Sequence, residues 1–130
     1  MQKYSEYLDT WKTNNLKFEE ALEIYEGMIN GINKCKALDK DEFVSELIKK
    51  AIKYTEIRVN WEIMSREEKI DKDSLRTGYH DSFITSINII SRLLDLEGID
   101  ISWRDKLGDD RKRIGDFACF MSYMIGITNR

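Results

Sequence analysis

The stretch SLRTGYHDSFITSINIISRLLDLE, residues 74–97, decides the fold. Its apolar side chains recur every three or four residues, which is the period of one face of an α-helix. They are Phe83, Ile87, Ile90 and Leu94. Gly98 follows directly and suits the C-terminal cap of such a helix. We therefore predict a long amphipathic helix whose apolar face needs partners.

Helical periodicity continues on both sides of this stretch. Apolar stripes predict further helices over residues 18–35, 41–64 and 109–127, and a short helical turn over 102–107. The D-x-x-E pattern at 39–42 is typical of a helix start, and Ser65 begins a similar capping pattern. We expect the helix over 41–64 to break near Met64, before a polar link through Asp73.

A short N-terminal leader helix completes the predicted fold. Its apolar residues share one helical face: Tyr4, Tyr7, Leu8 and Trp11. No segment alternates convincingly over the length of a strand, and the main helices are joined by short loops. The prediction is therefore an all-α, up-and-down bundle of about four main helices plus the leader, forming one domain over residues 1–130.

Composition excludes several classes of protein. The chain of 130 residues is 42% hydrophobic and 35% charged, so a disordered chain is excluded. With a net charge of −3, nucleic acid is not an expected partner. The longest nearly apolar stretch, 117–127, is shorter than the roughly 20 residues of a membrane span. No secretory signal is recognised at the start, and we expect a soluble cytoplasmic protein with no membrane association.

Metal and cofactor sites are not expected. Cys35 and Cys119 lie far apart among apolar neighbours, which favours buried free thiols. His80-Asp81 matches part of the HD phosphohydrolase pattern, but the chain has one histidine where that metal site needs two. The helical nucleotide pyrophosphohydrolases bind magnesium through E-x-x-E and E-x-x-D pairs. Residues 23–26 and 68–71 fit those letters, yet chance matches are expected among 24 acidic residues.

Three basic side chains fall near apolar stripes: Arg58, Arg76 and His80. If the helices that carry them are antiparallel, they meet and could bind an anionic ligand such as a phosphate or carboxylate. The alternative is an internal ion-pair network with Glu62 or Asp81, which is the commoner way to bury charge. If the chain is an enzyme, His80 is the candidate for acid–base catalysis.

Other polar residues receive structural interpretations. Arg113 shares a helical face with Phe117, and Asp116 lies at the edge of that face. We expect this end of the last helix to lie away from His80. The lysines of 49–53 are interpreted as a solvated face, and Trp103 as a plug at the end of the bundle.

The C-terminal third carries a family resemblance. Residues 99–105, IDISWRD, followed by 108–118, GDDRKRIGDFA, resemble small uncharacterised all-helical proteins of low-GC Gram-positive bacteria and their phages. The resemblance implies a small intracellular helical protein, with a phage- or defence-related role as a further expectation. It covers about a third of the chain and transfers no catalytic residue.

Two classes of function stay open. The first is a non-enzymatic module that binds a protein partner, either another protein or a second copy of itself. One version is an acidic immunity or inhibitor protein that binds a basic partner through exposed carboxylates. The second is a small-anion or phosphate-ester site at Arg58, Arg76 and His80. No cofactor is expected for either.

Overall fold

A computed structural model describes residues 15–128, and all its regular elements there are helices. In chain order they are α2 (Phe18–Lys34), α3 (Lys40–Trp61), α4 (Arg66–Leu96), α5 (Ser102–Leu107) and α6 (Arg111–Thr128). The all-helical prediction is confirmed. The predicted leader helix lies outside the described residues.

Local signals in the sequence set the ends of several helices. The Asp39 side chain accepts a hydrogen bond from the Glu42 N–H at 3.2 Å and starts α3. Gly98 and Gly108 have φ values of 72° and 74°, a region that favours glycine, and they end α4 and α5. These ends agree with the sequence prediction to within a few residues.

The start of α4 corrects the predicted polar link. Ser65 Oγ accepts from the Glu68 N–H at 3.1 Å, and Glu68 Oε1 accepts from the Ser65 N–H at 3.3 Å. This reciprocal capping box begins the helix at Arg66, so residues 66–73 are helical. The pattern at Ser65 is therefore the start of α4 itself.

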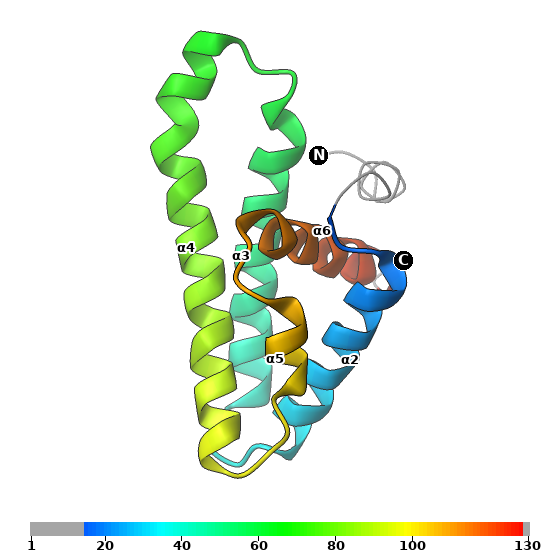
Figure 1. The fold of residues 1–130 in the computed structure, drawn as a ribbon. Coiled ribbons are helices and arrows are strands. Elements are labelled where there is room, and N and C mark those ends of the chain that lie inside the picture. Colours follow the sequence, from blue (N-terminus) through cyan, green and yellow to red (C-terminus); the bar gives the residue numbers. More distant parts are fainter. Residues whose placement is uncertain (1–14, 129–130) are drawn as a thin grey trace.

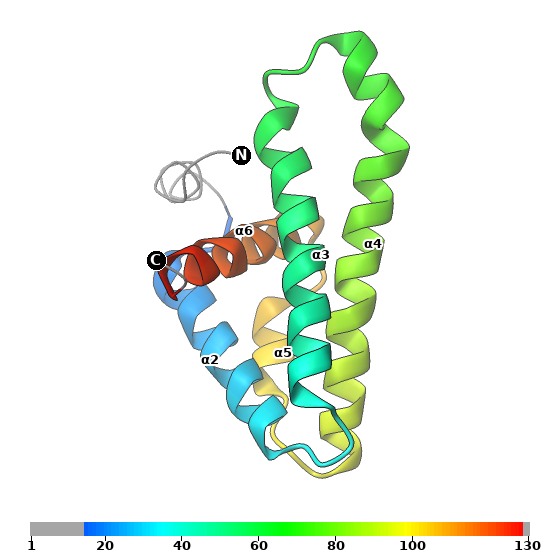
Figure 2. The same ribbon diagram turned by 180° about the vertical axis from the view of Figure 1, so that it is seen from behind.

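The helices are not arranged as a simple up-and-down bundle. α3 and α4 form a long antiparallel hairpin, and α2 packs mainly against α5, which lies between α2 and the hairpin in Figure 1. α6 runs across α3 instead of alongside it, and the end of the hairpin around residues 61–70 extends beyond α6 (Figures 1 and 2). The crossing brings the start of α6 close to Arg58, in the last turn of α3, and to Thr77 of α4.

Aromatic side chains link the helices at the core. Phe117 of α6 lies 6.5 Å, between ring centroids, from both Phe83 of α4 and Phe120. Phe120 in turn contacts Phe18 of α2 at 5.5 Å. Trp103 of α5 is buried against α2, as expected for a plug. Burial of this apolar surface is the main source of stability.

Candidate functional site

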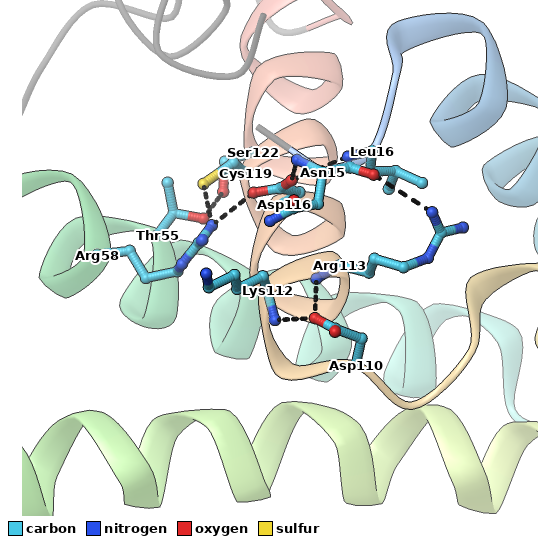
Figure 3. Close-up of polar contacts among 10 residues, drawn as sticks. All are labelled: Asn15, Leu16, Thr55, Arg58, Asp110, Lys112, Arg113, Asp116, Cys119 and Ser122. Carbon is cyan, nitrogen blue, oxygen red and sulfur yellow. Dashed lines mark hydrogen bonds and ion pairs between the residues drawn. The ribbon is translucent and has the colours of Figure 1, made fainter. Parts of the chain in front are cut away.

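The most buried polar cluster is centred on Asp116 of α6, whose side chain is fully buried (Figure 3). Arg58 of α3 donates from Nη1 to Asp116 Oδ1 at 3.1 Å and lies 3.5 Å from the Cys119 sulfur. Asp116 Oδ2 accepts from the backbone N–H groups of Asn15 and Leu16, at 2.7 and 3.1 Å. One carboxylate thus joins α3, α6 and the segment that precedes α2.

This arrangement corrects one sequence expectation. The end of the last helix that carries Asp116 was expected to lie away from His80, and Glu62 or Asp81 were the expected internal acids. Asp81 does contact His80, but it is not the partner of Arg58. Arg58 instead pairs with Asp116 because α6 crosses α3 at the level of Arg58. Gly115 makes the approach possible, since a Cβ atom there would lie 2.4 Å from Arg58 Nε.

The electrostatics of this cluster favour a structural role. Burial raises the pKa of Asp116, while Arg58 and the two backbone N–H groups oppose that rise. Burial also raises the pKa of Cys119, which keeps its thiol protonated and a poor nucleophile. Ser122 Oγ is 3.1 Å from Thr55 Oγ1, so the neighbouring hydroxyls bond to each other. The Arg58–Asp116 pair is satisfied internally and stabilises the contact between α3 and α6.

Arg76 and His80 lie on successive turns of α4 and face α3. The Arg76 guanidinium lies over Trp61, 3.9 Å from the ring centroid, and pairs with Asp73 at 3.3 Å. The His80 ring packs edge-on to Tyr54 at 5.6 Å between centroids, and its Nδ1 lies 3.1 Å from Asp81 Oδ1.

The Tyr54 ring lies between two of the three predicted site residues, Arg58 and His80. Arg58 Cζ is 5.9 Å from the centroid of the Tyr54 ring, and the His80 ring is in direct contact with it. Each of Arg58, Arg76 and His80 also has its own carboxylate partner within the chain. The geometry therefore brings the predicted residues near one another and supplies the internal pairing that was the alternative. Ligand binding by them stays a prediction.

A groove along the seam of α3 and α4 was not recognised in the sequence. It consists of two adjoining hollows of about 190 and 200 Å³ that share Lys53 and Tyr79. The lining residues from α3 are Glu46, Lys49, Lys50, Lys53, Glu56, Ile57 and Asn60, and those from α4 are Lys72, Leu75, Tyr79 and Ser82. Met64, between the two helices, completes the lining. The side of the hairpin seen in Figure 2 has no other helix over it.

The α3–α4 groove combines an apolar surface with positive charge. Ile57, Met64, Leu75 and Tyr79 supply apolar groups. Four lysines and two glutamates give the lining a formal charge of +2, against −3 for the chain. Lys50 donates to Ser86 Oγ at 2.6 Å, and Lys49 lies 3.8 Å from Glu46. Within residues 15–128, Lys53 and Lys72 form no ion pair.

The lysines at 49–53 are thus part of a hollow, where the sequence predicted only a solvated face. Periodicity alone could not distinguish a flat solvated face from a groove, because it gives the direction of a side chain but not the position of the neighbouring helix.

The described part of the chain contains no group of three or more His, Cys, Asp or Glu side chains that could hold a metal ion. Among the same residues, no helix combines the length and apolar character needed to cross a membrane. No family model matches the chain, and neither a curated protein nor a solved structure matches it.

Proposed function

We propose that this chain is a non-enzymatic protein-interaction module whose α3–α4 groove binds an acidic amphipathic helix of a partner protein. The observation that carries the proposal is the groove itself, an apolar seam bordered by lysines on the uncovered side of the hairpin. An amphipathic helix that lays its apolar face into such a seam is a recurring mode of protein recognition.

The dimensions of the groove suit a helix. On α3 it extends from Glu46 to Asn60, which at about 1.5 Å per residue is roughly 21 Å. A partner helix of about 18 residues covers that length with about one further turn. Leu75, which lines the groove, is itself 42% exposed. Exposed large apolar side chains beside a hollow are typical of an interaction surface.

Charge determines which helix the groove favours. Lys53 and Lys72 have no acidic partner within the described chain, so glutamates or aspartates of a ligand could approach them without competing with an internal ion pair. Such rim charges accelerate association and select partners more than they add affinity. An acidic immunity or inhibitor protein, considered from the sequence, would bind a basic partner, whereas the groove favours an acidic one.

The cytoplasm remains the location that we expect for this protein.

The test uses synthetic helical peptides of about 18 residues with one shared pattern of leucines. One peptide carries glutamate at its polar positions, and the other carries lysine. Fluorescence anisotropy should show saturable binding of the acidic peptide, weakened by salt, and at least tenfold weaker binding of the basic one. Equal binding of the two peptides, or binding of neither, would overturn the proposal.

Two matched variants locate the contact. Lys53→Glu should weaken binding of the acidic peptide at least tenfold, because it inverts a charge inside the groove. Lys112→Glu makes the same charge change at an exposed position of α6 outside the groove and should leave binding within about twofold. An equal loss in both variants would indicate a general charge effect. Analytical sedimentation of the free chain tests whether a second copy of the chain occupies the groove instead. A dimer that Lys53→Glu disrupts would assign the groove to a second copy and contradict an acidic partner protein.

A further inference from the structure

Two buried nitrogen atoms on α4 lack hydrogen-bond partners. Arg76 Nε and His80 Nε2 are both inaccessible to solvent, and neither has a partner within the described residues. They lie four residues apart, so they belong to one face of the helix. Leaving a buried donor unpaired destabilises the folded chain, and more so for a charged group. Arg76 Nε always carries a hydrogen. His80 Nδ1 faces the Asp81 carboxylate, which only accepts, so Nε2 donates when both ring nitrogens carry a proton. In that form the two atoms lack an acceptor that they could share.

Further cations surround these atoms. Arg111, in the first turn of α6, donates from Nη2 to Thr77 Oγ1 at 3.1 Å, which places its guanidinium beside the residue that follows Arg76. Arg58 lies on the Tyr54 ring that also contacts His80. Three helices thus supply basic groups to one region, and this region is separate from the lining of the α3–α4 groove.

The neighbouring carboxylates contact other atoms of the Arg76 and His80 side chains. Asp73 contacts Arg76 through Nη2, and Asp81 contacts His80 through Nδ1. Both aspartate side chains are about two-thirds exposed, at 62% and 67%, and exposed pairs of this kind contribute little stability. Asp116 is committed to Arg58 and to two backbone N–H groups. None of the three accepts a hydrogen bond from Arg76 Nε or His80 Nε2.

We infer that Arg76, His80 and Arg111 bind an oxyanion, the phosphate group of a small molecule. A phosphate presents several acceptor oxygens, so it can accept from Arg76 Nε and, when both nitrogens of the His80 ring carry a proton, from His80 Nε2 at the same time. Arginine suits phosphate because its planar guanidinium donates in a fixed fork, and charge-assisted hydrogen bonds are the stronger kind. Trp61 holds the Arg76 guanidinium by stacking, which orders it before a ligand arrives.

The single histidine of the chain provides the readout. In proton NMR its ring signals come from His80 alone, so they report on this site without labelling. Inorganic phosphate is titrated at fixed pH, and the ionic strength is held constant with chloride. We expect the His80 signals to shift and saturate. A shift that stays linear, or that equals the effect of chloride, would overturn the inference.

Variants separate the site from a general response to salt. Arg76→Met keeps an apolar side chain on Trp61 and should weaken phosphate binding at least tenfold. Arg111→Met does not disturb the core, because Arg111 is exposed, and it should also weaken binding. Arg92→Met removes an exposed arginine farther along α4 and should leave the titration unchanged. If phosphate binds Arg76→Met and Arg111→Met as well as the natural chain, the site is not where we place it.

Discussion

Two glycines inside helices have opposite roles in this molecule. A Cβ atom at Gly115 would meet the Arg58 guanidinium, whereas at Gly78 it would have no neighbour within 4 Å. Alanine is favoured over glycine inside a helix by about 1 kcal/mol. At Gly115 an alanine would also push Arg58 away from the buried Asp116 carboxylate. Loss of a buried ion-pair partner costs roughly 3 kcal/mol, which exceeds the gain in helix propensity.

We therefore expect Gly78→Ala to raise the free energy of unfolding by about 1 kcal/mol. Gly115→Ala should lower it by more than about 1 kcal/mol, because Asp116 loses part of its pairing. Urea denaturation followed by circular dichroism measures both changes. If Gly115→Ala is as stable as Gly78→Ala, Arg58 moves aside without cost, and its contact with Asp116 contributes little.

The same residues show the limit of reading single positions from sequence. Inward basic residues at 58, 76 and 80 were recognisable because they interrupt apolar stripes. Their partners were not, because a helical period gives the buried face but not the crossing angle of the helix packed on it. Once α6 crosses α3, Asp116 becomes the acid nearest to Arg58.

Among the elements, α4 is the clearest case of partial predictability. The part from Ser74 onward carries an apolar stripe, and a helix over residues 74–97 was predicted from it. Its first turns, 66–73, extend along the part of the hairpin that projects beyond α6, so they have little core to face and show no stripe. The capping box at Ser65 was visible in the sequence, but without a stripe behind it the segment was interpreted as a link.

The far end of α4 fixes the loop between α2 and α3. Glu97 accepts from the backbone N–H groups of Lys36 and Ala37 at 2.9 and 2.8 Å and from the Cys35 thiol at 3.1 Å. The Lys36 N–H, the Cys35 thiol and the Ala37 N–H stabilise the ionised carboxylate and lower the pKa of Glu97. Because the folded pKa is below the unfolded one, Glu97 contributes stability above its ordinary pKa of about 4.3, and this is lost as the pH falls through the folded value.

Glu97→Gln should therefore be less stable than the natural chain at neutral pH, and the difference should shrink as the pH falls below about 4. Urea denaturation at a series of pH values measures it. Glu26→Gln, at an exposed position of α2, is the control and should change stability little at any pH. A Glu97→Gln effect that is constant with pH would contradict a role for the ionised carboxylate.

On the scale of the whole molecule, α6 is the element that unites the fold. It contacts each of the other described helices, and α3 most extensively. The all-helical class and the sequence positions of the main helices could be predicted, because periodicity and capping are local properties. The path of α6 across α3, and with it the groove left open on the other side of the hairpin, depends on packing between distant segments and was not predictable from one sequence.

The contact between Asp116 and Leu16 also has a kinetic consequence. It joins residues 100 positions apart, whereas contacts within the hairpin, such as Lys50 to Ser86, join residues 36 apart. A chain loses more entropy in closing the longer loop, so the shorter-range hairpin should form first and the Asp116 contact after the rate-limiting barrier. Asp116→Asn should then accelerate unfolding roughly tenfold and change the folding rate by less than about threefold. Stopped-flow measurements in urea test this order, and a folding rate slowed as much as unfolding is accelerated would place the closure of the chain at the barrier itself.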